Sequence, residues 1–357
     1  MAVSRAKASD KIRLGISSCL LGERVRYDGG HKHDAYLTDT LGQFVQWVPV
    51  CPEVECGLPV PREMMNLVVP VRRNLEKGTG TFSGRVRRPA CGPLDVAERE
   101  PVSFSSPRLV TIRTRVDQTE RMLSWARRRV EELARENLCG FVFKANSPSC
   151  GREGVPVYDA RGMAQESGVG LFARLFMERF PHLPVEDDLR LHDPALRENF
   201  IERVFALRRY RDALGAGGGA RGRLVAFHAA HKLLLMAHSP ALLAEIGRLV
   251  ARSKDLPLPD LRRRYEELLL KALGLKATPA KHANVLEHMM GYLKKNLSAD
   301  EKQEMLALVG DYRAGLVPLI VPLALMKHYV RKYDVGYLAQ QAYLSPHPAE
   351  FALRNHA

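Results

Sequence analysis

The sequence has few cysteines for its length, and none of them form the arrangements that mark a disulfide framework or a compact metal site. Its 357 residues contain six cysteines, and no two of these are spaced as C-x-x-C. That spacing is the strongest local signature of a zinc or redox site. Sparse, unpaired cysteines in a chain of this length are typical of a reducing compartment, in which thiols stay free to bind a metal. The sequence therefore predicts a cytoplasmic protein.

Segments for export and for crossing a membrane are also missing from the sequence. Residues 1–7 contain no apolar run of the kind found in a signal peptide. The longest apolar run, near Val317–Met326, is interrupted by Pro318 and Pro322 and is too short to span a bilayer. The glycine-rich stretch Gly217–Gly219 follows a helical pattern rather than a strand, which indicates a linker and not a phosphate-binding loop. We expect no membrane contact.

Three of the cysteines each follow a short apolar run. The length and composition of these runs favour buried strands over helices. In an open α/β sheet the carboxyl ends of parallel strands converge on one crevice, where ligands bind. The three thiols are therefore predicted to meet at one site, although they are distant in sequence. The runs are Ile12–Ile16 before Cys19, Phe44–Val50 before Cys51, and Phe141–Phe143 before Cys150.

The loops that contain these cysteines are rich in small, turn-forming and polar residues. Such turns present backbone N–H groups, which stabilise the thiolates of iron–sulfur clusters. The alternative is that the three are ordinary buried cysteines, since free cysteine is among the most buried residue types. Cys56, five residues after Cys51, could serve as a further ligand and would then close the site. Cys139, before a predicted strand, is interpreted as a core residue, and Cys91 lies outside these motifs.

Four multi-residue motifs follow one another in the first half of the chain. The first runs from Ser17–Gly22 to Arg26–Gly29, and the others are Cys51–Glu53, Gly57–Arg62 and Lys144–Gly151. In these motifs and in their order the chain resembles the 2-thiouracil desulfidase (TudS-like) family. Separate motifs in a fixed order make this resemblance specific.

The resemblance implies a [4Fe–4S] cluster that is held by only three cysteines. Carried over motif by motif, these are Cys19, Cys51 and Cys150. An iron without a protein thiolate is an open Lewis-acid position, which suits the soft sulfur of a thiocarbonyl. The implied reaction is not a redox step: water adds at the ring carbon and the C–S bond breaks, which leaves a carbonyl and releases inorganic sulfide.

Polar residues of the same motifs are the candidates for catalysis and substrate binding. Glu53 lies two residues from a cluster ligand and is the predicted general acid/base, and Ser147 is predicted to hydrogen-bond the substrate or the transferred proton. The predicted substrate-binding residues are Ser18, Asp28 and Ser149. The alternatives are a surface carboxylate for Glu53 and a turn residue for Asp28, because Tyr-Asp-Gly-Gly is itself a good turn sequence.

The length of the chain and its element pattern predict two domains. Up to about residue 190, strand patterns alternate with helical ones, including helices near 116–138 and 169–179. This predicts an α/β fold, a Rossmann-like open sheet that carries the Fe–S site, followed by an all-α domain. The expected domains are 1–190 (TudS-like), 191–221 (a connecting helix and glycine-rich linker) and 222–357 (helical). The helical segment resembles the YbgA-like domain that is often fused to desulfidase domains.

Charge is concentrated in the helical half of the chain. Residues 1–190 contain 29 Lys and Arg against 24 Asp and Glu, whereas residues 191–357 contain 25 against 16. An excess of this kind favours a polyanionic partner, because phosphate contacts supply most of non-specific nucleic-acid affinity. A solvated basic face is the alternative for any single cluster. The predicted RNA-binding residues are Arg208, Arg209, Arg262, Arg263, Arg264, Lys294 and Lys295.

Three histidines share one face of a predicted helix, at His228, His231 and His238. No carboxylate or cysteine at ligand spacing accompanies them, so we interpret them as residues that face RNA or a neighbouring helix, and not as a metal site.

A desulfidase-like domain joined to a basic helical domain predicts an enzyme that acts on a thiolated base inside RNA. The fused architecture resembles tRNA 4-thiouridine desulfidases, which makes tRNA the expected partner and uridine the expected product. A flipped or splayed nucleotide would expose its sulfur to the site. Two alternatives remain open: a desulfidase of free thiouracils whose helical domain serves oligomerisation, and a non-catalytic Fe–S sensor that binds nucleic acid. The sequence leaves the oligomeric state open.

Overall fold

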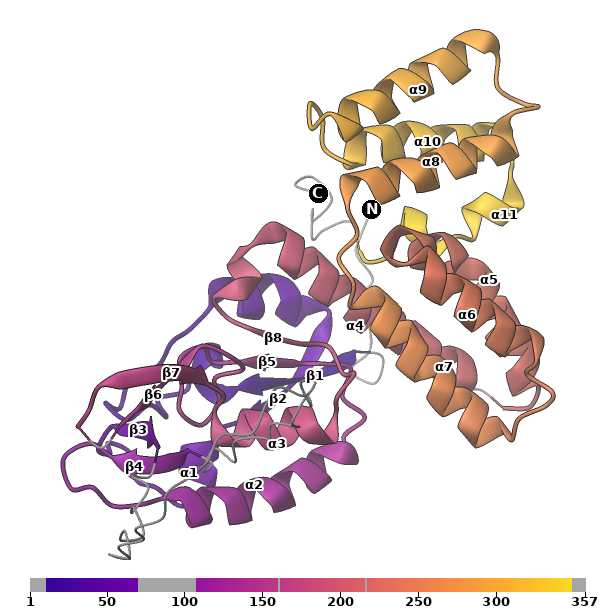
Figure 1. Ribbon diagram of the computed structural model, residues 1–357. Coiled ribbons are helices and arrows are strands. Elements are labelled where there is room, and N and C mark those ends of the chain that lie inside the picture. The colour runs from indigo at the N-terminus through magenta and orange to yellow at the C-terminus, as the bar shows by residue number, and fades with distance from the viewer. Residues whose placement is uncertain (1–10, 70–106, 160, 216, 349–357) are drawn as a thin grey trace, which may run out of the picture.

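The computed structural model describes residues 11–69, 107–159, 161–215 and 217–348. It contains an α/β part, which carries all the strands of these ranges, and a helical part that follows it (Figure 1). The predicted fold class, an α/β domain with an open parallel sheet followed by an all-α region, is confirmed. No helix in the described ranges is long and apolar enough to cross a membrane. Cys91 lies outside the described residues.

The central sheet is parallel throughout and has the strand order β2-β1-β5-β8. The three apolar runs that precede the cysteines all form strands of this sheet, and they lie next to one another in it. The chain passes from β1 to β2 on one side and later enters β5 on the other side of β1, so the direction of winding reverses between β1 and β5. A reversal of this kind opens a crevice at the carboxyl ends of the strands. The strands are β1 (Ile12–Ser17), β2 (Val45–Val50), β5 (Phe141–Phe143) and β8 (Val185–Asp187).

A second sheet of four short strands, which the sequence did not predict, lies beyond the carboxyl ends of the first. Its strand order is β4-β3-β6-β7, with β3 parallel to β6 and antiparallel to β4. Residues of β3 and β6 line the same cavity as the cysteine loops, so this sheet forms the opposite wall of the crevice. The strands are β3 (Met65–Val68), β4 (Arg108–Thr111), β6 (Val155–Tyr158) and β7 (Ala164–Gly168).

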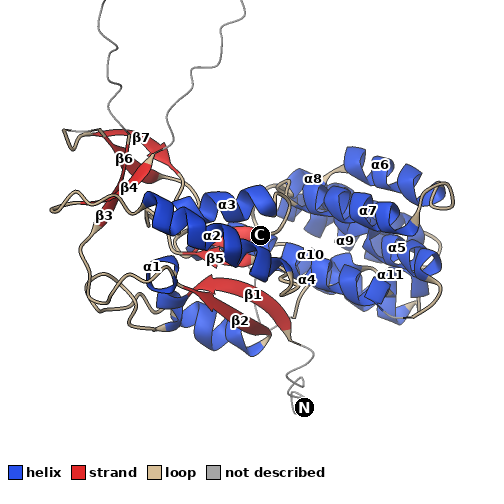
Figure 2. Cartoon of the chain, turned by 90° about the horizontal axis from the view of Figure 1, so that it is seen from below, coloured by secondary structure: helices blue, strands red, loops and turns tan. Residues whose placement is uncertain are grey.

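Helices α2 (Thr119–Ala134) and α3 (Leu171–Arg179) pack against each other beside the central sheet (Figure 2). Both fall within the predicted helical ranges. The start of α2 is set by local hydrogen bonds, since the Asp117 carboxylate accepts from the backbone N–H of Thr119. The Phe141 ring of β5 packs on Phe172 and Phe176 of α3, with ring centroids 5.9 and 4.8 Å apart.

Gly15 is the residue of β1 that makes room for this aromatic cluster. A Cβ at Gly15 would lie 2.1 Å from Cδ2 of Phe141, on the neighbouring strand. Gly15→Ala should therefore destabilise the fold by about 1–3 kcal/mol, because overpacking forces side chains and backbone to shift. Denaturant unfolding measures this effect. Gly310→Ala is the matched control: Gly310 lies in a helix with open space around it, so alanine there should stabilise by about 0.5–1 kcal/mol. Equal stability of the two variants would contradict the packing.

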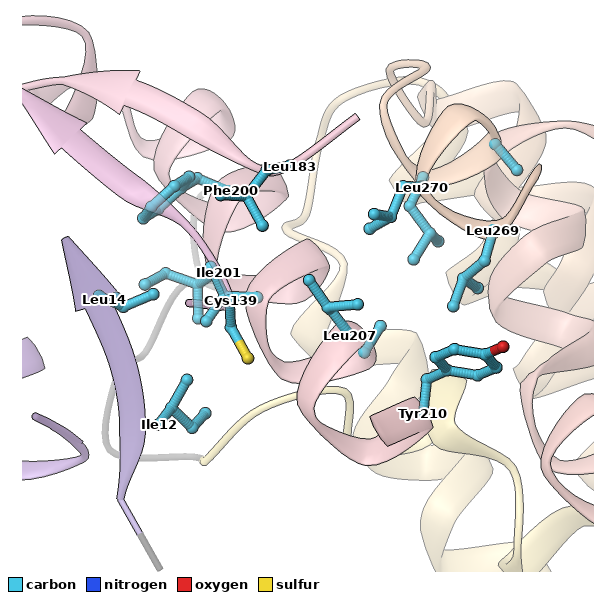
Figure 3. Packing of buried hydrophobic residues seen from close by; sticks show 14 of the residues in the cluster. Ile12, Leu14, Cys139, Leu183, Phe200, Ile201, Leu207, Tyr210, Leu269 and Leu270 are labelled. Atoms are coloured by element: carbon cyan, nitrogen blue, oxygen red, sulfur yellow. The ribbon is translucent and has the colours of Figure 1, made fainter. Parts of the chain in front are cut away.

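Helix α4 (Pro194–Gly215) joins the two parts of the chain. The Asp193 carboxylate caps its start by accepting from the N–H groups of Ala195 and Leu196. Its first half packs on the sheet through Phe200 and Ile201, and its second half enters the helical part through Leu207 and Tyr210 (Figure 3). The buried apolar residues of both parts consequently form one continuous core.

The helical part begins after the glycine-rich break that the sequence predicted. Helix α4 ends at Gly215, and α5 starts at Ala220 after Gly219, whose φ of +78° lies in the left-handed region that glycine favours. The helices are α5 (Ala220–His238), α6 (Pro240–Ala251), α7 (Leu258–Leu273), α8 (Pro279–Leu293), α9 (Ala299–Arg313), α10 (Ile320–Lys332) and α11 (Gly336–Ala339). Helix α9 starts with a capping box formed by Ser298 and Glu301.

Candidate active site

Three thiols and the acidic residue Glu53 line one cavity of about 570 Å³ at the carboxyl edge of the central sheet. The thiols are those of Cys19, Cys51 and Cys150, which follow β1, β2 and β5. All three are at least nine-tenths buried and free of disulfides. The structure therefore brings the three predicted cysteines to one crevice, as the strand-end argument expects.

Cys19 is held by a short turn directly after β1. The 3-10 helix η2 (Ser18–Leu21) begins where the strand ends, and Gly22 closes it with a φ of +92°. The carbonyl of Cys19 accepts from the backbone N–H of Lys32, 2.9 Å away, which ties the turn to the following loop.

Cys51 is the residue that precedes the short helix α1 (Pro52–Glu55). Pro52 starts this helix, and the Glu55 carboxylate accepts from the backbone N–H of Cys51 at 2.8 Å. The thiol of Cys51 lies 3.6 Å from the Glu53 carboxylate. Cys56, at the end of α1, donates its thiol hydrogen to the carbonyl of Glu53 and does not line the cavity.

Cys150 lies in a tight turn after β5. Its backbone N–H donates to the Ser147 hydroxyl at 3.1 Å, and the N–H of Gly151 donates to the Ser147 carbonyl at 2.7 Å. The start of α3 closes over this turn, because a Cβ at Gly170 would lie 2.5 Å from the Ser149 carbonyl. Only glycine allows this approach.

When no metal is bound, burial keeps all three thiols protonated. Desolvation, followed by the nearby Glu53 carboxylate, raises the pKa of Cys19 to about 11 and that of Cys51 to about 12. The same two causes raise the pKa of Cys150 well above its ordinary value, while a hydrogen bond from Ser17 opposes them. Thiols of this kind are poor free nucleophiles, and they favour the thiolate only when a cation binds them.

The donor set fits an iron–sulfur cluster. Thiolates are the ligands of such clusters, and the three here reach a common cavity without a disulfide partner. Within the described residues, no group of His, Cys, Asp and Glu side chains is arranged to hold a single metal ion. A four-iron cluster differs from a single ion because each thiolate binds a different iron.

Glu53, Ser149 and Ser147 form a chain of hydrogen bonds beside the thiols. The hydroxyl of Ser149 donates to the Glu53 carboxylate, and the hydroxyls of Ser149 and Ser147 lie 3.0 Å apart. Ser147 lines the cavity, whereas Ser149 is fully buried behind it. The expectation that Ser149 binds substrate is therefore corrected: its hydroxyl links Ser147 to Glu53. Hydrogen bonds that run from Ser147 through Ser149 to Glu53 can transfer a proton between the cavity and the carboxylate.

Arg62 holds the other side of the Glu53 carboxylate. Its guanidinium Nη2 lies 3.8 Å from Oε2 of Glu53, and the side chains are only 8% and 12% exposed. Arg62 also donates to the carbonyl of Val25 at 2.9 Å, so its position is fixed from both sides. Glu53 is thus a largely buried, oriented carboxylate and not the surface carboxylate that the sequence left as the alternative.

Ser17 and Lys144 also belong to the site, although the sequence analysis gave them no role. Ser17 hydrogen-bonds the thiol of Cys150, and its hydroxyl accepts from the backbone N–H of Lys144 at 2.9 Å. The Lys144 ammonium lines the cavity, pairs with Asp188 at 3.0 Å and lowers the pKa of Cys19. Both residues stand in the sequence motifs of the desulfidase resemblance, and that position was the only signal that could have identified them.

The remaining predicted residues of this domain divide between the cavity and the surface. Ser18 lines the cavity. Asp28 does not: its carboxylate accepts from the N–H of Gly30 at 3.0 Å and faces solvent, so it is corrected to a turn residue. Cys139 is buried in the core, as predicted.

The predicted RNA-binding residues are not equivalent. Arg208 pairs with Asp212, and Arg262 donates to the carbonyl of Leu214. Arg209 donates to His231 at 3.2 Å and to the carbonyl of Pro346 at 2.7 Å, so it is corrected from an RNA contact to a structural residue. Exposed side chains occur at Arg263, which pairs with Glu267, and at Arg264, Lys294 and Lys295.

The three histidines of α5 are buried core residues. His228 hydrogen-bonds the hydroxyl of Tyr265, and His238 hydrogen-bonds the carbonyl of Leu275. His231 stacks on Phe227, with ring centroids 3.8 Å apart. His231 also accepts a hydrogen bond from Arg209 of α4, so each of the three histidines has a partner within the fold, which agrees with the packing interpretation.

Comparison with known proteins matches both parts of the chain. Residues 14–188 match the family model described as 2-thiouracil desulfurase, and residues 232–348 match DUF1722, described as a protein of unknown function. Over 159 residues the chain is 34% identical to the uncharacterized protein YbgA of Escherichia coli K12, a match that spans 44% of this chain and 94% of YbgA. The solved structure of a [4Fe-4S]-dependent thiouracil desulfidase, TudS, is 25% identical and covers 54% of this chain and 100% of its own, with a TM-score of 0.36.

A parallel sheet with buried thiols at its carboxyl edge, matched by that family model, places the α/β part in the desulfurase class. The chain belongs to the family of YbgA, and it joins a part that matches the 2-thiouracil desulfurase model to a part that matches DUF1722.

Proposed function

We propose that this protein is an iron–sulfur-dependent desulfidase that converts 4-thiouridine in tRNA to uridine and releases sulfide. The observation that supports it most is the single cavity in which three buried thiols from three parallel strands meet the oriented carboxylate of Glu53. Cys19, Cys51 and Cys150 would hold a [4Fe–4S] cluster. When bound, such a cluster with three protein ligands supplies one open iron, a Lewis acid for the soft sulfur of the substrate.

The protein's own residues perform the proton transfers of a hydrolysis. Conversion of a thiocarbonyl to a carbonyl consumes one water and needs a base to take a proton from it. Glu53 is the base, since Arg62 and Ser149 hold its carboxylate oxygens in place beside Cys51. Ser147 lines the cavity and passes the proton to Glu53 through Ser149. The same chain returns a proton to the departing sulfur.

The proposed role of the helical part is to bind the RNA. Its excess of basic residues supports a polyanionic partner, and exposed cations without a carboxylate within salt-bridge distance occur at Arg264, Lys294 and Lys295 of the described chain. The family description, 2-thiouracil desulfurase, supports a second candidate: action on a free thiouracil, with the helical part used for self-association.

A salt titration of tRNA binding separates these candidates. We expect the affinity of the full chain for tRNA to fall steeply with salt, because each neutralised phosphate releases counterions. Replacing Arg264, Lys294 and Lys295 by glutamate should weaken binding and reduce the slope of log K against log salt by roughly 0.7–0.9 for each phosphate that is no longer neutralised. Desulfidation of free 4-thiouridine should remain at the wild-type rate.

Point substitutions suit this test better than deletion of residues 222–357. Deletion would expose Leu207, Tyr210 and Leu214 of α4, which are buried in the continuous core. Arg263→Glu is a control for net charge, since Arg263 is exposed but already paired with Glu267. Salt-independent tRNA binding, or equal activity of wild type and triple variant on tRNA, would favour the free-thiouracil candidate.

A further inference from the structure

The helical part contains a second cavity, of about 550 Å³, which is separate from the thiol site. We call it the tyrosine groove. It is formed by helices α5, α6, α8 and α11, and among the residues that the structure describes no carboxylate contributes to its lining. The residues that matter for its chemistry are His228, Lys232, Gly247, His288, Tyr292 and Tyr337.

Two exposed tyrosines form one wall of the tyrosine groove. The rings of Tyr292 and Tyr337 stack with centroids 4.9 Å apart and an angle of 29°, and the residues are 45% and 37% exposed. His288 meets Tyr292 edge-on, at 5.5 Å and 76°. Exposed, mutually oriented rings leave π faces and edges open to solvent, which is the arrangement on which nucleobases stack.

The floor of the tyrosine groove is apolar, and one of its residues is a glycine, which has no side chain to fill the space. Leu233 and Met236 of α5 and Val250 of α6 line it, and Gly247 leaves it open. The buried His228 uses Nδ1 to bond the hydroxyl of Tyr265, and its Nε2 lies 3.9 Å from where a Cβ on Gly247 would be. The tyrosine groove therefore combines an apolar floor with an imidazole whose orientation is fixed by Tyr265.

Positive charge accompanies the aromatic wall. Lys232 is an exposed lining residue with no carboxylate within salt-bridge distance in the described chain. Lys294 and Lys295, which directly follow α8, are exposed as well, but they are not among the residues that line the groove. Unneutralised lysines beside stacking rings are typical of sites that bind single-stranded nucleic acid, because the cations contact the phosphates. An apolar peptide would gain nothing from these charges.

We propose that the tyrosine groove binds an unstacked nucleotide of RNA, with the base against Tyr292 and Tyr337 and its phosphate against Lys232. This inference rests on the proposed action on RNA and deepens it, because it assigns a site by which a polymeric substrate is held while another of its nucleotides is desulfurated. A nucleoside cannot occupy both sites at once. The groove should therefore affect the KM for tRNA and leave both kcat and the reaction of free 4-thiouridine unchanged.

The test is the binding of a fluorescent single-stranded oligouridylate and of tRNA to the full chain, measured by anisotropy. Tyr292→Ala with Tyr337→Ala should weaken oligouridylate binding by roughly tenfold or more, since a stacked base contributes about 1–3 kcal/mol. Tyr292→Phe with Tyr337→Phe should bind within about twofold of wild type, because phenylalanine keeps the ring face. Lys232→Ala should weaken binding and reduce its salt dependence. Arg313→Ala, which removes an exposed charge from α9, outside the lining, should change neither.

The outcomes separate this inference from the proposed function. Wild-type affinity in the double alanine variant and in Lys232→Ala overturns the groove as an RNA site, even if desulfidation of tRNA is intact. If the wild type does not bind oligouridylate and the double alanine variant no longer self-associates, the inference is overturned, because the groove then binds a second copy of the chain and not RNA. If the cluster-loaded protein has no desulfidase activity but the variants change oligouridylate binding as expected, the groove is supported as an RNA-binding site and the proposed desulfidase function fails.

Discussion

Replacing Cys19, Cys51 or Cys150 singly by alanine is expected to abolish iron loading and desulfidation together. The three thiols come from three different strands, so none of them can take the place of another. Anaerobic reconstitution should give roughly four irons per wild-type chain, with visible thiolate-to-iron absorbance, and a value near background for each variant.

Cys56→Ala is the matched control for this prediction. Cys56 lies on the same short segment as Cys51, but its thiol donates to the carbonyl of Glu53 and does not reach the cavity. The variant should keep its iron and its activity, and Cys139→Ala should keep its iron as well, because that thiol is buried at the opposite end of the sheet, before β5. Loss of iron in Cys56→Ala, or a fully active Cys150→Ala, would show that the ligand assignment is wrong.

Glu53→Gln is expected to keep the cluster and to lower kcat by roughly 100-fold or more. Glutamine has the shape of glutamate and can still accept from Ser149, but it cannot take a proton from water. The Glu53 carboxylate raises the pKa of all three cysteines, so its removal favours their thiolates and should not weaken iron binding. Iron analysis and single-turnover desulfidation measure the two effects separately.

Glu55→Gln provides the comparison within the same helix. Glu55 accepts from the backbone N–H of Cys51 and pairs with Arg129, and it does not line the cavity. Its substitution should reduce turnover far less than that of Glu53. If Glu53→Gln desulfurates at the wild-type rate, or if both variants lose activity equally, Glu53 is not the acid/base group.

The strand ends of the α/β part could be predicted because they follow from local sequence. Each apolar run is short and bounded by turn residues, and a parallel sheet places the carboxyl ends of all its strands at one edge. Cys19 and Cys51 therefore needed no knowledge of distant contacts to be placed together. The core position of Cys139 follows in the same way from its place before β5.

The second sheet could not be predicted, since its pairing is not local. Strand β3 pairs with β6 through Leu67 and Val157, which are far apart in the sequence, and each strand is too short for its alternation to specify a register. The sequence pointed to Ser147 for proton transfer, but it could not show that Ser149 links Ser147 to Glu53 and does not face the substrate. Both serines stand in one motif, and only the turn, which buries Ser149, decides which of them faces the cavity.

Basic residues on a helix are ambiguous for a related reason. Successive residues point about 100° apart, so Arg208, Arg209 and Arg211 face different neighbours although they form one cluster in the sequence. Arg208 pairs with Asp212 on its own helix, Arg209 packs against His231, and Arg211 reaches Asn137 of the α/β part. Composition gives the net charge of the helical part, but it does not show which of the cations already pair with groups of the same chain.

Nucleoside mass analysis of tRNA treated with the reconstituted protein tests the central claim most directly. Cluster-loaded wild type should remove 4-thiouridine from tRNA, with an equal gain in uridine and one sulfide released for each base converted, and Glu53→Gln loaded with the same amount of iron should leave it in place. If iron-loaded wild type leaves the 4-thiouridine content of tRNA unchanged while it desulfurates free thiouracil, the claim that its substrate is a base within RNA is contradicted.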